Sequence, residues 1–242
     1  MVRIGVILTH DNAIDPELQQ WCPPDVTVHI ARTGYIEDED CLAWSRRAAD
    51  QDLEVAVRSL AFLRPGVTAY ACTSGSFVDG VAGERRVRER MLAAGARDAI
   101  TASGAVVEAL DALGARRVAV GTPYDDGCTA ALGAFLAEAG FDVVSLVGEA
   151  PRPGSDINDY TPEDLTDLAR RAAHPDADAV FLSCTALSTI ELLPLLEREL
   201  GRPVLSSVQA TMWAALRAVG RTPAPGGQRL LGLRGGTRLP AG

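Results

Sequence analysis

The stretch VTAYACTSGSF, residues 67–77, decides how this chain folds, because a β-branched and apolar run ends in a cysteine and a loop of small polar residues. The stretch AVFLSCTALS, residues 179–188, repeats the same order: an apolar run, then a cysteine followed by threonine. Short runs without polar alternation are typical of strands in a parallel sheet that helices cover on both faces. We therefore place Cys72 and Cys184 at the ends of two equivalent strands.

An internal duplication relates the two cysteine segments. A shift of 112 positions places Cys72 on Cys184, and it also places the run 6–8 on the run 118–120. The same shift places Asn12 on Tyr124, just beyond the first strand of each half. A repeat of this kind predicts two similar structural units.

The rest of the chain alternates short strand-like runs with helical stretches, which indicates the α/β class. Thr161-Pro162 followed by acidic residues predicts the start of one helix. We expect two similar lobes, each a parallel sheet flanked by helices, related by pseudo-twofold symmetry with the active site in the cleft between them. The expected strands cover residues 3–8, 26–31, 67–71, 98–101, 116–121, 142–147, 178–183 and 203–206.

The expected lobes divide the chain into three parts. Residues 1–103 with 207–220 form the first lobe, and residues 104–206 form the second. Residues 221–242 are rich in proline and glycine and are expected to form a loose C-terminal tail. Because ligands bind at the carboxyl ends of parallel strands, both cysteines are expected to line one shared cleft.

Composition narrows the classes of function. The 242 residues include 32 acidic and 23 basic side chains, and this balance disfavours nucleic acid as a partner. No apolar run approaches the length of a membrane span, and the chain begins directly with a strand-like run rather than a secretory signal. We expect a soluble, cytoplasmic protein with its five cysteines reduced. The three histidines are scattered, so no metal site is expected.

The cysteine loops carry the chemistry that the sequence indicates. A cysteine at a turn from strand to helix meets free backbone N–H groups and the positive end of the helix dipole, which lower its pKa and favour the reactive thiolate. Thr73 and Ser74 in one loop and Thr185 in the other could hold a carboxylate without a basic side chain. The pattern favours a small carboxylate as substrate.

Ala71-Cys72-Thr73-Ser74 and Ser183-Cys184-Thr185 resemble the two cysteine signatures of the aspartate/glutamate racemase superfamily. The resemblance covers nearly the whole chain. It is strongest to the branch of maleate cis-trans isomerases and arylmalonate decarboxylases, together with related proteins of ectoine utilisation. It implies catalysis without a cofactor.

The resemblance also implies roles for individual residues. Asn12 resembles a substrate-binding asparagine of the isomerases, Tyr124 their active-site tyrosine and Asn158 a second asparagine. In these isomerases the thiolate at the Cys72 position adds to the double bond of maleate. After rotation about the resulting single bond, with the cysteine at the Cys184 position handling the proton, elimination gives fumarate. The expected function is therefore isomerisation of a small unsaturated dicarboxylate through a covalent cysteine adduct.

Alternatives remain open at this point. The loop at Cys72 is similar to the dioxyanion loop of the decarboxylases, except that they carry glycine in place of the cysteine. A racemase or decarboxylase of the same superfamily would use the thiol pair for proton transfer. A protein of another class, a non-catalytic carboxylate binder, would need no pair of reactive thiols. Members of the superfamily are often oligomeric, so a homo-oligomer is also expected.

Overall fold

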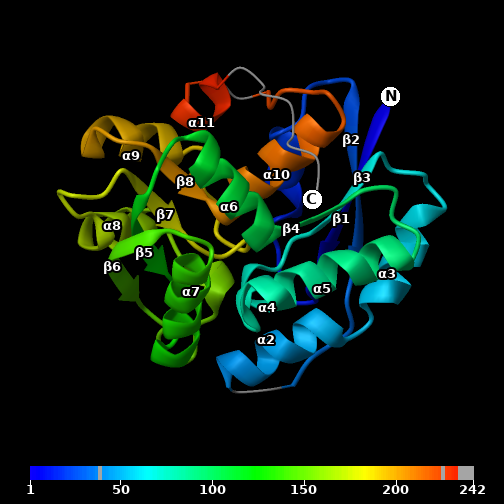
Figure 1. The fold of residues 1–242 in the computed structure, drawn as a ribbon, viewed down its shortest axis with the longest axis horizontal. Coiled ribbons are helices and arrows are strands. Elements are labelled where there is room, and N and C mark those ends of the chain that lie inside the picture. The colour runs from blue at the N-terminus through cyan, green and yellow to red at the C-terminus, as the bar shows by residue number, and fades with distance from the viewer. Residues whose placement is uncertain (38–39, 225–226, 234–242) are drawn as a thin grey trace.

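Two parallel four-stranded sheets form the centre of the protein. The computed structural model describes residues 1–37, 40–224 and 227–233. Figure 1 shows the two sheets in separate lobes that lie side by side. The first sheet has the order β2-β1-β3-β4 and the second has the order β6-β5-β7-β8, so the two lobes share one topology. The strands are β1 (Val2–Leu8), β2 (Val26–Arg32), β3 (Val67–Tyr70), β4 (Ala99–Thr101), β5 (Arg117–Thr122), β6 (Asp142–Gly148), β7 (Ala179–Leu182) and β8 (Val204–Ser206).

All the strands expected from the sequence are confirmed, with small changes at their ends. The internal duplication predicted from the shift of 112 positions is also confirmed. Strands β1 and β3 occupy the places in the first sheet that β5 and β7 occupy in the second. Every residue of β3 and β7 is buried. Burial on both faces explains why these strands are continuous apolar runs rather than alternating ones.

Helices cover the faces of both sheets. In the first part of the chain they are α1 (Asp15–Gln20), α2 (Cys41–Asp50), α3 (Leu53–Ala61), α4 (Thr73–Phe77), α5 (Gly80–Ala93) and α6 (Ala102–Ala112). In the second part they are α7 (Asp126–Glu138), the 3-10 helix η1 (Ile157–Asp159), α8 (Pro162–Ala172), α9 (Leu193–Leu200), α10 (Ser207–Ala218) and α11 (Arg229–Gly232). The predicted start of α8 is confirmed, because the Thr161 side chain accepts from the amide of Asp164, whose carboxylate in turn accepts from the Thr161 amide.

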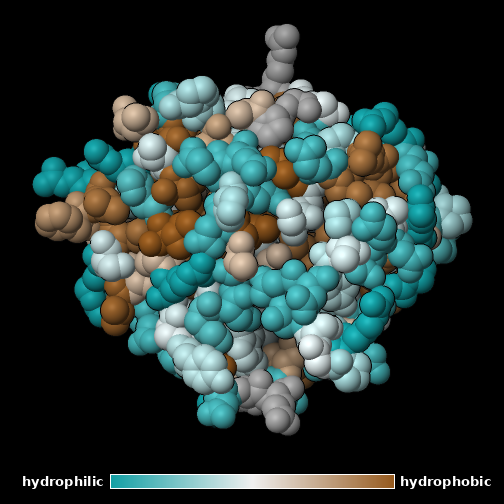
Figure 2. All heavy atoms as spheres, turned by 180° about the vertical axis from the view of Figure 1, so that it is seen from behind, coloured by the Kyte–Doolittle hydropathy of each residue, from teal (hydrophilic) through white to brown (hydrophobic). Residues whose placement is uncertain are grey.

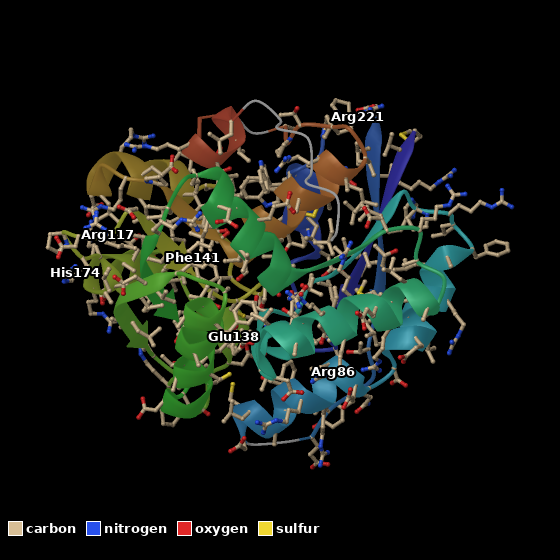
Figure 3. All side chains as sticks on the ribbon, viewed as in Figure 1. Arg86, Arg117, Glu138, Phe141, His174 and Arg221 are labelled. Carbon is tan, nitrogen blue, oxygen red and sulfur yellow. The ribbon has the colours of Figure 1, made fainter. Side chains whose placement is uncertain are left out.

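The lobes meet through several helices. Helix α10 packs along α6 and also contacts β3, β4 and β8. Glu138, labelled in Figure 3, extends from the end of α7, and its carboxylate accepts a hydrogen bond of 3.0 Å from the amide of Val81 in α5. The hydrophobic core runs through both lobes, with buried residues of β1, β3, β5, β7 and α10 in one continuous cluster. The lobe boundaries near residues 103 and 206 stay a prediction.

The expected loose tail differs from the structure in part. Residues 229–232 form α11, where Leu230 and Leu231 are buried in the core. The amide of Arg229 donates to the carboxylate of Glu197 at 2.9 Å. Two leucines within a stretch of glycine and proline are enough to dock this short helix, which composition alone did not indicate. Residues 234–242 of the expected tail lie outside the described residues.

Figure 2 shows hydrophilic residues over much of one face, with apolar side chains exposed among them. Polar side chains such as those of Arg117 and His174 lie at the outer edge of the second lobe (Figure 3). Within the described ranges, no helix has both the length and the apolar character that crossing a membrane requires.

Candidate active site

A cavity of about 590 Å³ lies where the carboxyl ends of β1, β3, β5 and β7 meet. Its wall contains all eight residues that the sequence analysis assigned to the site: Asn12, Cys72, Thr73, Ser74, Tyr124, Asn158, Cys184 and Thr185. The parallel topology explains this convergence, because it carries the loops after four strands to the same edge of the two sheets. These residues are separated by up to 173 positions in the sequence, from Asn12 to Thr185.

Cys72 lies between β3 and α4, and its side chain is 5% exposed. Its Sγ is 3.9 Å from Ser74 Oγ, and it also contacts the hydroxyl of Tyr70. Burial raises the pKa of the Cys72 thiol to about 11, although hydrogen bonds with the Gly75 amide and with Tyr70 act in the opposite direction. The expectation of a lowered pKa is therefore wrong for Cys72, because desolvation outweighs the backbone amide.

Gly75 is required next to this thiol. A Cβ at this position would lie 2.5 Å from Tyr70 Oη and 3.2 Å from Cys72 Sγ. Any side chain here would push the tyrosine hydroxyl or the thiol from its place. Sequence reasoning did not identify this role, since one glycine in a loop has many structural explanations.

The hydroxyls of Ser76 and Thr73, which both follow Cys72, differ in their hydrogen-bond partners. Ser76 Oγ lies 2.9 Å from the carbonyl oxygens of both Cys72 and Thr73, so it shapes the loop. Thr73 Oγ1 is buried and has no hydrogen-bond partner among the described residues. A buried hydroxyl without a partner is costly. Thr73 is therefore a donor that a bound ligand could satisfy.

Cys184 follows β7, and its side chain is 8% exposed. Its φ is 102°, a left-handed value that is strained for any residue except glycine. The backbone amide of Cys184 donates to Ser207 Oγ at 3.1 Å, and Cys184 Sγ accepts from the amide of Ala186 at 3.5 Å. Burial raises the pKa of the Cys184 thiol to about 12, opposed by hydrogen bonds with the Ala186 amide and the Tyr124 hydroxyl.

The expectation that Cys184 opens a helix is wrong. Residues 185–187 form a turn and a bend, and the next helix, α9, begins only at Leu193. No helix therefore begins directly after this thiol in the sequence. The backbone amide at Ala186 takes the place of a helix N-terminus as the local donor.

Each thiol thus has a tyrosine as its partner. Tyr70 lies two residues before Cys72 in β3, and Tyr124 reaches Cys184 from the end of β5. Burial raises the pKa of both tyrosines well above its usual range, so both hydroxyls keep their protons. The Tyr124 prediction came from a resemblance, whereas Tyr70 was missed because it lies within an apolar strand.

Three predicted binding residues are engaged in contacts between loops. Thr185 Oγ1 donates to the carbonyl oxygen of Ala71 at 2.7 Å and accepts from Asn12 Nδ2 at 3.4 Å. Asn158 Nδ2 donates to the carbonyl oxygen of Asp11 at 2.8 Å, and its Oδ1 accepts from the amide of Ala13 at 3.2 Å. These side chains line the cavity, and they also tie together the loops that form it.

The cavity is electrostatically unusual for a site that would hold an anion. Among its lining residues within the described ranges, Asp11, Asp125 and Asp156 are acidic and none is lysine, arginine or histidine. Any carboxylate would be held by hydroxyl, amide and backbone donors, of which Thr73 Oγ1 is free. No group of three or more metal-ligating side chains occurs in the part of the chain that the structure describes.

Part of the cavity lining is apolar. Trp44 and Cys41 of α2 contribute to the wall, together with Pro123 and Pro151. Sequence analysis did not place α2 at the site, because nothing in its local pattern indicates which helix lies across the cleft.

Comparisons with known proteins are consistent with this geometry. A family model described as arylmalonate decarboxylase matches residues 49–231. The arylmalonate decarboxylase of Bordetella bronchiseptica is 39% identical over 161 residues, 64% of this chain and 65% of that protein, so the chain matches slightly less than two thirds of its length. The maleate isomerase of Nocardia farcinica is 32% identical over 191 residues, 76% of each chain.

Solved structures show the same fold. The maleate isomerase Iso from Pseudomonas putida S16 superposes with a TM-score of 0.86 at 25% identity, covering 95% of this chain and 98% of the other. A cysteine-to-serine mutant of the Nocardia farcinica maleate cis-trans isomerase superposes with a TM-score of 0.81 at 26% identity, covering 95% and 98% of the two chains. That mutant contains a covalently bound succinylcysteine intermediate.

Proposed function

The chain belongs to the arylmalonate decarboxylase family of enzymes, and on this premise we propose that it is a cofactor-independent cis-trans isomerase of a small unsaturated dicarboxylate, of the maleate-to-fumarate type. The observation that carries the proposal is the position of Cys72 and Cys184 on the wall of one cavity, each beside a tyrosine hydroxyl. The succinylcysteine in the mutant maleate isomerase supports a covalent route for an enzyme of this fold.

The substrate carboxylates would be bound by neutral donors. Thr73 Oγ1 is buried without a partner, and Ser74 Oγ lies beside the Cys72 thiol. A carboxylate at this position would satisfy the Thr73 hydroxyl and hold the adjacent double bond near Cys72 Sγ. Asn12, Thr185 and Asn158 stay proposed binding residues, and their observed bonds fix the loops around the substrate.

The proposed reaction starts with one of the two thiols protonated, Cys184, and the other, Cys72, present as the thiolate. Cys72 is the nucleophile in the proposal, and Cys184 is the proton donor; burial raises the pKa of both thiols, so Cys184 keeps its proton at neutral pH. The Cys72 thiolate adds to one alkene carbon, and the electron pair of the double bond takes the Cys184 proton at the neighbouring carbon. The product is a succinyl adduct with a single carbon–carbon bond.

Rotation about this single bond is fast compared with rotation about the double bond. The Cys184 thiolate then removes a proton from the carbon that was protonated, the double bond re-forms in the trans geometry and the Cys72 sulfur–carbon bond breaks. Both thiols return to their starting states, so no oxidant, reductant or cofactor is consumed. Covalent catalysis replaces one high barrier by two lower ones.

A trapping experiment tests the covalent step. In a Cys184→Ser variant incubated with maleate, intact mass spectrometry should show one added maleate, and peptide mapping should place it on Cys72. Cys22→Ser is the matched control, because Cys22 is a buried thiol outside the cavity. An adduct on a different cysteine, or none on Cys72, would argue against the proposal.

A second candidate within the same family is decarboxylation or racemisation of a substituted acid through the thiol pair. The apolar lining residues Trp44, Pro123 and Pro151 favour it, since a four-carbon dicarboxylate leaves part of a cavity of about 590 Å³ unfilled. Carbon dioxide release from 2-substituted malonates, or deuterium exchange at an α-carbon, would identify this activity. A cytoplasmic location, a role in ectoine utilisation and a homo-oligomer stay predictions.

A further inference from the structure

Glu17 is a buried carboxylate that the mechanism above does not use. It lies in α1, its side chain is 4% exposed, and it reaches across to the chain that follows Cys184. Its carboxylate accepts from Ser188 Oγ at 2.7 Å, from the Thr189 amide at 2.9 Å and from the Ile190 amide at 3.1 Å. Trp21 Nε1 adds a fourth donor at 3.3 Å.

These donors are all neutral, which distinguishes Glu17 from a carboxylate in an ion pair. Burial raises the pKa of Glu17, while the bonds from Ser188, Thr189 and Trp21 favour its ionised form. A buried carboxylate is costly unless its oxygens are satisfied. Here most of the donors to the α1 side chain come from a loop that belongs to the other sheet, and Trp21 supplies the remaining one.

The loop that Glu17 holds is continuous with Cys184. Thr189 Oγ1 lies 2.7 Å from Ser206 Oγ, and the next residue, Ser207, accepts from the amide of Cys184 at 3.1 Å. The chain from 184 to 190 is therefore fixed near both of its ends. Because the φ of Cys184 is 102°, its conformation must be imposed by its surroundings.

We propose that Glu17 is a positioning residue, which holds the loop at 188–190 so that Cys184 Sγ stays directed into the cavity that it shares with Cys72. The role rests on the proposed function, since it concerns the thiol that transfers the proton. Glu17 lies five residues after Asn12, so the segment that reaches the cavity from β1 also fixes the loop of the second thiol.

The test compares Glu17→Gln with Glu197→Gln. Glutamine keeps the shape of the side chain, but its NH₂ group cannot accept from the amides of Thr189 or Ile190. Glu197 is the matched control, because it is also buried and accepts from backbone amides, those of Val204 and Arg229, and it does not line the cavity. A merely structural role would make the two variants behave alike.

The expected result in Glu17→Gln is a fall in kcat for maleate of roughly 10- to 100-fold with little change in KM, because a displaced proton donor slows the chemical step. Glu197→Gln should keep kcat within about threefold of wild type even if its midpoint of unfolding falls. Wild-type kcat in Glu17→Gln, or an equal loss in both variants, would overturn the proposal.

A second readout separates this proposal from the proposed function. The rate at which iodoacetamide alkylates Cys184, measured peptide by peptide, should change in Glu17→Gln while the Cys72 rate does not, whether or not maleate is a substrate. Unchanged alkylation of Cys184 contradicts the positioning role, whereas absence of maleate turnover in wild type contradicts only the proposed function.

If Glu17→Gln does not fold, Ser188→Ala removes one donor and should shift kcat and Cys184 alkylation in the same direction by a smaller factor. No shift in Ser188→Ala would then count against the role.

Discussion

Thr185 donates a hydrogen bond of 2.7 Å from its hydroxyl to the carbonyl oxygen of Ala71. Each of these residues is the immediate neighbour of a cavity cysteine, Cys184 and Cys72. The bond therefore joins the two cysteine loops directly across the two lobes.

Thr185→Val should damage both stability and turnover. The variant keeps the shape of the side chain but leaves the carbonyl oxygen of Ala71 without this donor, at a cost of about 1–3 kcal/mol in the free energy of unfolding. kcat should fall about tenfold or more because the loops lose their register. Urea unfolding and steady-state kinetics measure the two effects. Thr185→Ser keeps the hydroxyl. If this variant lost as much stability and kcat as Thr185→Val, the hydrogen bond to Ala71 would not be responsible.

The reaction should speed up with rising pH. Since burial raises the pKa of Cys72 to about 11, only a small fraction of it is thiolate at neutral pH. The alkylation rate of Cys72 and kcat/KM should both rise roughly tenfold per pH unit between about pH 7 and about pH 10. A plateau near neutral pH would mean that the thiol is already ionised and that the site lowers its pKa.

Gly75→Ala should impair the first thiol. The added methyl group would lie 2.5 Å from Tyr70 Oη and 3.2 Å from Cys72 Sγ, so one of them must move. We expect about 1–3 kcal/mol of destabilisation and a loss of Cys72 reactivity. Gly232→Ala is the control, because nothing lies within 4 Å of a Cβ built at that position. Equal alkylation rates of Cys72 in Gly75→Ala and wild type would contradict this reading of the loop.

Asn158→Ala should act mainly on substrate binding. It removes the bonds to the carbonyl oxygen of Asp11 and the amide of Ala13, which tie the loop at 155–159 to the loop after β1. Because this contact closes one side of the cavity, KM should rise about tenfold while kcat changes less. Asn158→Asp retains the acceptor for Ala13, but it loses the donor to the Asp11 carbonyl oxygen and adds a negative charge to a cavity that would hold a dicarboxylate, so its KM should rise at least as much. A large fall in kcat at constant KM would assign Asn158 to the chemical step instead.

Local pattern and internal repetition were sufficient to predict the strands, the common topology of the lobes and the meeting of Cys72 with Cys184. Buried parallel strands carry a strong signal because both of their faces are apolar. The repeat then supplied long-range information that a single strand lacks, and it placed Asn12 and Tyr124 at equivalent ends. The roles of the individual site residues stay predictions.

Other features depend on tertiary packing that no local pattern carries. The turn after Cys184 looks like a helix start in the sequence, but the Glu17 carboxylate and Ser207 hold it in another conformation. The pKa of each thiol depends on whether hydrogen bonds from backbone amides or desolvation dominates. That balance is set by how deeply the loops are buried, which composition does not reveal. Trp44 and Tyr70 reach the site through the packing of α2 and the pairing of β3, and neither lies in a recognisable motif.

The most direct measurement is proton NMR of maleate with the purified protein in deuterated buffer, with Cys72→Ala, Cys184→Ala and Cys22→Ser variants beside the wild type. The account predicts conversion of maleate to fumarate by the wild type and by Cys22→Ser, and none by the two cavity variants. Full turnover in Cys72→Ala or Cys184→Ala, or no fumarate from the wild type, would contradict it.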